Sequence, residues 1–161
     1  MQEYTFKMWD DESYQVVGYR GDEEVVTVPS TFHGRPVTIL YDGLFKGHTE
    51  IKEVIIPEGV TDIGGFVFDG CTSLERIHLP TTLKDIWQYA FARCGIKEIH
   101  IPEKIKRLIP FTFKDCKDLE KVFCMPGVEE IQAYCFRGCR KDLQILSKRI
   151  MKISDKAFED I

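Results

Sequence analysis

Apolar and polar residues alternate with a period of two in a series of short segments along the chain. The clearest are residues 74–79 (LERIHL), 96–101 (IKEIHI) and 119–124 (LEKVFC). Such alternation is typical of a β-strand with one buried face, and the prolines that follow two of these segments end the strand by removing a hydrogen-bond donor. The apolar residues expected to point inward are Ile51, Val54, Ile56, Leu74, Ile77, Leu79, Ile96, Ile99, Ile101, Leu119, Val122 and Cys124.

A phenylalanine followed three residues later by a cysteine recurs every 22 or 23 residues. The pairs are Phe68/Cys71, Phe91/Cys94, Phe113/Cys116 and Phe136/Cys139, and the frame extends outward to Phe45/His48 and Phe158/Ile161. Two apolar columns keep the same frame, one formed by Leu40, Ile63, Ile86, Leu108, Ile131 and Ile153 and the other by Val37, Val60, Leu83, Ile105, Val128 and Ile150. A fixed period in this range predicts a solenoid of stacked coils.

Each repeat predicts one coil, made of a strand, a bend, a short turn or 3-10 segment, and a return to the next strand. Stacked coils place their strands side by side in a parallel sheet on one face, with rungs about 4.8 Å apart. The predicted fold class is therefore an α/β-type repeat solenoid, mostly β, with the turns on the other face.

Residues 1–28 do not follow the repeat. They hold three segments rich in β-forming residues, separated by the polar turns DDES and RGDEE. Because the first coil of a solenoid exposes its core unless something covers it, we expect residues 1–28 to form an N-terminal β cap. Residues 29–161 then supply five repeats and a final half-coil of one continuous domain, with an inserted loop at residues 30–36.

The unit I-P-x-x-V-x-x-I-x-x-x-x-F-x-x-C-x-x-L-x-x-I-x-I, seen at residues 56–79, resembles the BspA-like leucine-rich repeat family. The atypical first unit, VPSTFHGRPVTIL at residues 28–40, is similar to that family's opening unit. The resemblance covers residues 14–161. It implies a right-handed leucine-rich-repeat solenoid of bacterial origin, a role in adhesion or protein binding, a cell-surface or secreted location, and no catalytic residues.

Composition adds limits on location and partners. An apolar content of 43% and a charged content of 30% indicate a globular chain. The net charge of −4 gives no reason to expect a nucleic-acid partner, and no run approaches the roughly 20 apolar residues of a membrane span. The N-terminus carries acidic residues where a signal peptide has basic ones, so the sequence leaves the location undetermined between the family's surface location and an internal one.

Six cysteines raise the alternatives of a zinc site or disulfide bonds. Four of them share one column with His48 and Ile161, which indicates a buried slot of small to medium size rather than a ligand set. We predict six free thiols, which behave as small hydrophobic side chains and suit a reducing compartment, and we predict no metal or other cofactor.

Three outward columns follow the predicted strands. Two alternate in charge along the stack and are formed by Lys52, Glu75, Lys97 and Glu120, and by Glu53, Arg76, Glu98 and Lys121. The third, formed by Ile55, His78, His100 and Phe123, is apolar and imidazole-rich. We take this stripe with Arg76, Glu98 and Lys121 as the candidate partner-binding surface, against the alternative of an ordinary exposed face. A metal at the two histidines would need further ligands, which this column does not offer.

Two other features have alternative interpretations. Phe66, Tyr89, Phe111 and Tyr134 form a column that predicts either an aromatic stack between coils or an exposed aromatic stripe for a partner. Arg20-Gly21-Asp22 matches a tripeptide that integrins bind, and it is also an ordinary polar hairpin turn.

No catalytic constellation is evident, so the sequence predicts a non-enzymatic module that binds an unidentified protein or glycan through its sheet face. The alternative is a structural module that self-associates. The final half-coil has no polar cap, so a homodimer would form through Phe158 and Ile161. The register break at residues 142–147 (DLQILS) predicts a bent or frayed strand before this end.

Overall fold

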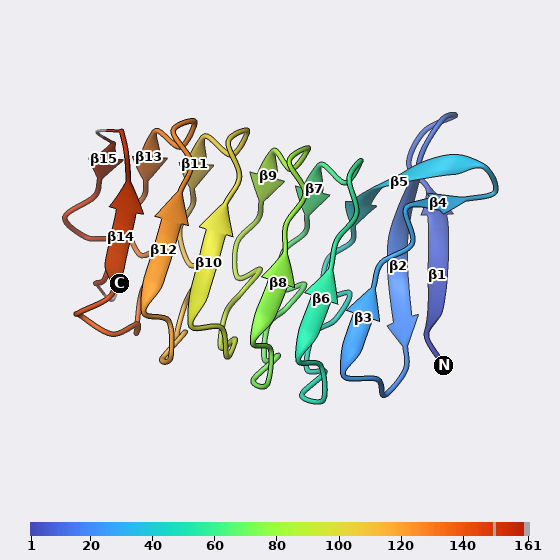
Figure 1. Ribbon diagram of the computed structural model, residues 1–161, viewed down its shortest axis with the longest axis horizontal. Coiled ribbons are helices and arrows are strands. Elements are labelled where there is room, and N and C mark those ends of the chain that lie inside the picture. The colour runs from blue at the N-terminus through green and yellow to red at the C-terminus, as the bar shows by residue number, and fades with distance from the viewer. Residues whose placement is uncertain (150, 160–161) are drawn as a thin grey trace.

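The computed structural model describes residues 1–149 and 151–159, whose strands stack as the coils of a β-solenoid (Figure 1). The strands are β1 (Glu3–Met8), β2 (Tyr14–Arg20), β3 (Val25–Thr27), β4 (Thr31–Phe32), β5 (Arg35–Leu40), β6 (Glu53–Ile55), β7 (Asp62–Ile63), β8 (Arg76–His78), β9 (Asp85–Ile86), β10 (Glu98–Ile101), β11 (Arg107–Leu108), β12 (Lys121–Cys124), β13 (Glu130–Ile131), β14 (Gln144–Ser147) and β15 (Lys152–Ile153). Within this described part, no helix is long and apolar enough to cross a membrane.

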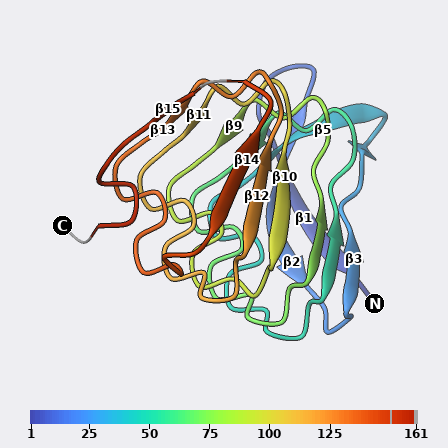
Figure 2. The ribbon, with the colours of Figure 1, turned by 60° about the vertical axis from the view of Figure 1, so that its left-hand side comes forward.

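Each coil contributes one strand to each of two parallel layers, which Figure 1 shows as a front and a back row. We call β3, β6, β8, β10, β12 and β14 the front sheet, and β2, β5, β7, β9, β11, β13 and β15 the back sheet. The third side, the turn face, carries the turns that lead from the back sheet to the front sheet, and Figure 2 shows the stacked loops at an angle.

The N-terminal segment joins both sheets. β1 pairs with β2 as an antiparallel hairpin, β2 then pairs in parallel with β5, and β3 pairs in parallel with β6. β2 and β3 therefore take the two strand positions of a coil, with β1 outermost. The inserted loop folds back as the short antiparallel pair β4–β5.

The repeat phenylalanines form a continuous column through the core, as the spacing predicts. Phe45, Phe68, Phe91, Phe113 and Phe136 are all fully buried. Neighbouring rings are stacked with centroid separations of 5.6, 5.2, 5.4 and 5.4 Å along this series. The two apolar columns that precede them are buried as well, apart from Ile153, which is exposed, and Ile150, which lies outside the described residues.

A second aromatic column lies on the turn face. The rings of Phe66, Tyr89, Phe111 and Tyr134 stack with centroid separations of 4.7, 5.2 and 5.7 Å. All four residues have positive φ, between 61° and 67°, a region that costs a non-glycine residue conformational energy. The stack between coils, the first of the two interpretations of this column, is thus observed, and the ring contacts offset the strained turn.

All six cysteines are free and buried, as predicted. Three thiols donate hydrogen bonds to the carbonyl of the phenylalanine in the preceding coil: Cys71 to Phe45, Cys116 to Phe91 and Cys139 to Phe113. Burial raises the pKa of the Cys94 thiol to about 12 and that of Cys124 to about 11. These thiols are therefore protonated and act as packing groups.

Both sheets are interrupted once, which the repeat pattern does not predict. Within the described residues β8 does not pair with β10 and β9 does not pair with β11, so the front and back sheets each fall into two parts. Figure 1 shows a wider step between these strands than between their neighbours. We call this interruption the seam. On the turn face the coils stay bonded across it, since the Phe68 amide donates to Ala90 over 2.7 Å and the Phe91 amide to Thr112 over 3.0 Å.

One missing residue explains the seam. The turn Cys94-Gly95-Ile96 is one residue shorter than Cys71-Thr72-Ser73-Leu74 in the preceding coil. A Cβ atom at Gly95 would lie 2.2 Å from the Thr72 carbonyl oxygen, so the coils meet here too closely for any side chain. The shortened turn lies directly before β10, the strand at which pairing with the preceding coil stops. Ile77 and Leu79, expected in the core, are consequently only partly buried.

A candidate binding face on the front sheet

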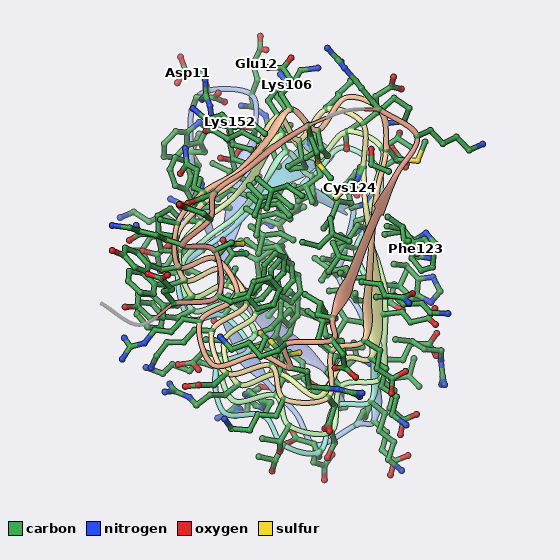
Figure 3. The ribbon with its side chains drawn as sticks, turned by 90° about the vertical axis from the view of Figure 1, so that its left-hand side faces the viewer. Asp11, Glu12, Lys106, Phe123, Cys124 and Lys152 are labelled. Carbon is green, nitrogen blue, oxygen red and sulfur yellow. The ribbon has the colours of Figure 1, made fainter. Side chains whose placement is uncertain are left out.

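The seven residues predicted to bind a partner all lie on the outer side of the front sheet. Ile55, Arg76 and His78 lie on the N-terminal side of the seam, and Glu98, His100, Lys121 and Phe123 on the C-terminal side. Figure 3, a view along the stack, shows Phe123 pointing away from the core and its neighbour Cys124 pointing into it. The alternation that predicted these positions is therefore observed.

The candidate stripe is divided into two halves by the seam. Ile55 is in register with His78 on one side, and His100 with Phe123 on the other. The two histidines, which the repeat places on adjacent rungs, are not paired through the backbone within the described residues. The stripe also continues to Leu146, which is in register with Phe123 and 39% exposed.

Leu146 was missed because of the extra residue in the turn before β14. Counting from the buried Leu143, which takes the place of Leu119, puts Leu146 out of frame with Phe123, whereas counting from the repeat cysteine Cys139 restores the frame. The prediction that this strand is frayed is wrong, since β14 pairs with β12 over four consecutive residues.

Each half of the stripe has its own contacts. The Nε2 atom of His78 lies 2.7 Å from a carboxylate oxygen of Glu53. This hydrogen bond, together with the Arg76 guanidinium, holds the pKa of Glu53 below its ordinary value. Across the seam the rings of His100 and Phe123 stack at 4.5 Å with an angle of 8° between their planes. One half thus presents a charged group and the other a flat aromatic surface.

The predicted charge ladder forms only in part. Arg76 lies 3.5 Å from Glu53 in the preceding coil, whereas Glu120 pairs with Arg140 at 3.2 Å and not with its column neighbour Lys97. Exposed pairs of this kind contribute about 0–1 kcal/mol each. Because the seam separates Arg76 from Glu98, the ladder is interrupted where the face is most open.

The seam opens on the front sheet as a groove of about 690 Å³. It is lined by Glu75, Arg76, Ile77, His78, Gly95, Lys97, Glu98, His100 and Glu120. Four of the seven predicted residues therefore border one groove, with the side chain of Ile77 at its base. A groove of this size with an apolar base and charged rims has the dimensions of a ligand site.

In the part of the chain that the structure describes, no strand pairs with the edges of β8 and β10 that border the groove. The Ile56 amide donates to His78 over 3.1 Å, and the Met125 amide donates to Ile101 over 3.1 Å. Because bonding alternates along a parallel strand, the backbone groups of Ile77 on one side and of Glu98 and His100 on the other are directed towards the seam. These groups are available to another extended chain.

The remaining predictions can be placed as well. No group of three or more potential metal ligands occurs within residues 1–149 and 151–159. Arg20 ends β2 and forms an ion pair with Glu3, while Gly21 and Asp22 lie in the connection to β3. Because β2 and β3 belong to different sheets, this connection is not the hairpin turn that was expected, and the integrin interpretation of Arg20-Gly21-Asp22 stays a prediction. Phe158 stacks on Phe136 at 5.5 Å and is partly buried, while Ile161 lies outside the described residues.

These stacked coils, with short strands on two faces and turns on the third, are those of a leucine-rich-repeat solenoid. The chain belongs to the BspA type leucine-rich repeat family, whose model matches six copies over residues 38–161. Leucine-rich-repeat solenoids present extended surfaces that such proteins use for binding. No curated protein matches the chain in sequence.

Solved structures of bacterial leucine-rich repeat proteins share the fold. A leucine-rich repeat protein from T. pallidum has a TM-score of 0.73 at 24% identity, with 98% of this chain and 88% of that one covered. A leucine-rich cell surface protein from Faecalibacterium prausnitzii has a TM-score of 0.68 at 24% identity, with 96% and 50% covered. The pneumococcal vaccine antigen PcpA has a TM-score of 0.69 at 22% identity, with 84% and 32% covered. The chain thus spans half or less of the last two proteins.

Proposed function

We propose that the chain is a non-enzymatic protein-binding module that holds an extended segment of a partner protein in the front groove. The observation that carries this proposal is the seam, because it presents two unpaired strand edges that face each other. Exposed edges of this kind bind extended peptides through backbone hydrogen bonds. Ile77 provides an apolar contact below such a peptide, and the half-stripe of His100, Phe123 and Leu146 extends the contact along the sheet.

The descriptions of two similar proteins support a proposal for the location. A relative of known structure is described as a cell surface protein and another as a vaccine antigen. We therefore propose that the chain acts at a bacterial surface, where its partner is a protein on another cell or in the surrounding matrix.

The test is selection of peptides from a random display library, followed by measured affinities for variants. Phe123→Ala and His100→Ala should each weaken binding of a selected peptide about 10-fold, because both remove aromatic contact beside the groove. Trp87→Ala, which removes an exposed aromatic side chain from the back sheet, is the matched control and should leave the affinity unchanged. If a selected peptide binds Trp87→Ala more weakly and binds Phe123→Ala and His100→Ala as tightly as the parent protein, its binding site is not the front groove.

A second candidate function is self-assembly through the C-terminal end. Ile153 is 45% exposed there, and Phe158 has one stacked phenylalanine beneath it while the Lys141 ammonium lies 5.7 Å from its ring centroid. Exposed apolar groups at the end of a stack favour pairing with a second copy. Sedimentation should show a dimer that dissociates in the double variant Phe158→Asp with Ile161→Asp. A dimer that survives both changes has another interface.

A further inference from the structure

Three large aromatic side chains line one groove at the back sheet, on the face opposite the front groove. Trp9 follows β1, Tyr41 follows β5 and Trp87 follows β9, and they are 60%, 49% and 47% exposed. All three line one groove of about 310 Å³. Exposed apolar side chains that cluster in one place are a sign of a binding site, whereas single exposed ones are ordinary.

The repeat geometry makes part of this groove a slot. Tyr41, Gly64 and Trp87 occupy the same position on successive coils, since the Gly64 amide donates to Leu40 and the Trp87 amide to Ile63. Two rungs separate the aromatic residues by about 9–10 Å along the stack. A ring held between two aromatic faces needs about 7–8 Å, which is two van der Waals contacts. Because Gly64 has no side chain, the intervening coil places no residue side chain of this column between Tyr41 and Trp87, and all three positions line the groove.

Gly64 is fixed in this position by packing. A Cβ atom there would lie 2.5 Å from the Asp42 carboxylate and 2.8 Å from the Leu40 carbonyl oxygen. The Asp42 carboxylate and the Leu40 carbonyl group already occupy the space that a side chain at this position would need, so the position requires a glycine. The absence of a side chain at Gly64 is therefore fixed by the fold of this coil.

Polar groups surround the slot. Asp62 accepts hydrogen bonds from the Trp87 indole at 3.2 Å and from the Thr61 hydroxyl at 2.7 Å, which fixes the edge of the indole. Asp42 accepts from the Gly65 amide at 3.0 Å, and Gln15 also lines the groove. Aromatic faces beside carboxylate and amide groups complement a pyranose ring, which has apolar C–H faces and a rim of hydroxyl groups. A stable protein interface would need at least about 1,000 Å² of buried surface, which this small polar groove does not offer.

A basic groove adjoins the slot on the other side of Trp87. Its volume is about 510 Å³, and Lys84, Lys104, Lys106 and Arg107 line it against a single carboxylate, Asp85. Arg107 lies 3.8 Å from Glu130, whereas the three lysines make no ion pair among the residues that the structure describes. The groove exists because β9 and β11 are unpaired at the seam. Three lysines against one carboxylate leave an excess of positive charge beside Trp87, which favours an anionic group.

We propose that the back sheet binds an acidic oligosaccharide, with one sugar ring between Tyr41 and Trp87 and an anionic substituent of the next sugar on the lysines beyond Trp87. This site is independent of the front groove, since the two share no residue. It adds a second class of ligand, on the opposite face, to the protein segment proposed for the front sheet.

Intrinsic fluorescence tests the proposal directly, because the chain has two tryptophans and both line this groove. The probes are a heparin-derived hexasaccharide, which is sulfated, a hyaluronan hexasaccharide, whose anions are carboxylates, and neutral maltohexaose. We expect a saturable fluorescence change with at least one acidic probe, and about 10-fold weaker binding of the neutral probe. The comparison of the two acidic probes identifies the preferred anion. No saturable response to either, or equal affinity for maltohexaose, would overturn the proposal.

Variants separate a built site from general charge attraction. Lys104→Glu with Lys106→Glu should weaken binding of the acidic probe about 10-fold or more, and Trp87→Ala should do the same when binding is followed by calorimetry. Lys148→Glu with Lys156→Glu changes the net charge equally at exposed positions away from both grooves, and it should have little effect. An equal loss in this control, or equal binding of poly-glutamate, would show that the site does not select a sugar. Phe123→Ala should leave oligosaccharide binding intact while it weakens peptide binding. The two proposals can therefore fail independently of each other.

Discussion

At the scale of single residues, the core is a set of columns that each accept one size of side chain. The phenylalanine column needs the full ring, because each ring covers the rings of both neighbouring coils. The cysteine column accepts His48 at its start, since the imidazole can reach Glu50, 2.7 Å away, at the less buried end. The size of the slot and the access to water therefore decide which residue is accepted at each rung.

The phenylalanine column makes an energetic prediction. Phe91 is fully buried between Phe68 and Phe113, so Phe91→Ala should lower the free energy of unfolding by about 3–5 kcal/mol through the cavity that it leaves. Among the described residues Phe158 is stacked on Phe136 alone, and Phe158→Ala should cost clearly less. Urea denaturation of both variants measures the difference. Equal shifts in the two midpoints would contradict the stacked column.

The buried thiols make a chemical prediction. Burial raises the pKa of five of the cysteines, to about 12 for Cys94 and about 11 for Cys124, whereas a hydrogen bond with Cys116 lowers the pKa of Cys139. The thiolate is the reactive form. A thiol-specific reagent at pH 8 should therefore react slowly with the native protein and should titrate six thiols in denaturant without reductant. Four or fewer in freshly purified, unoxidised protein would indicate a disulfide and would remove the argument for a reducing compartment.

At the scale of elements, the sequence predicts most strands because alternation and period act together. Ile99, Ile101 and Val122 are buried as the alternation requires. Ile77 and Leu79 obey the same pattern and are nevertheless partly exposed, because their burial depends on the next coil as well as on their own strand. The short turn at Gly95 is visible in the sequence, but its effect on pairing appears only when the coils are stacked.

This explanation of the seam predicts that one residue repairs it. Replacing Gly95 with Thr-Ser gives the turn the length found in the preceding coil, and it should allow β8 to pair with β10. Backbone amides of Glu98 and His100 should then exchange with solvent at least about 10-fold more slowly, while amides in β12 change little. The measurement is hydrogen exchange followed by NMR. Unchanged exchange at these amides in a folded variant would show that turn length does not cause the seam.

At the scale of the whole molecule, the candidate sites could be predicted only on the front. The front stripe follows one repeat position, so the period reveals it. The back groove combines Trp9, outside the repeat, with Tyr41 and Trp87, whose column also contains Gly64 and Ile109. That column has no uniform chemistry, and only the folded arrangement brings the three aromatic residues to one groove.

The seam also sets how the whole molecule unfolds. The stability of a repeat protein is approximately the sum of its repeats and the interfaces between them, and the interface at the seam lacks the strand pairing that the others have. The N-terminal part, up to β9, retains the β1–β2 hairpin and its paired sheets. We therefore expect the coils from β10 onward to open together below the global transition.

Native-state hydrogen exchange in low urea tests this expectation. Amides in β10, β12 and β14 should share one opening free energy, lower than the value shared by β2, β5 and β7, with the boundary at the seam. The Thr-Ser replacement at Gly95 should bring the two values together, because it restores the missing pairing. The alternative outcome is that the amides of all strands of the parent protein share one opening free energy. In that case the stacked phenylalanines are sufficient to couple the two parts, and the seam does not lower the stability of the coils that follow it.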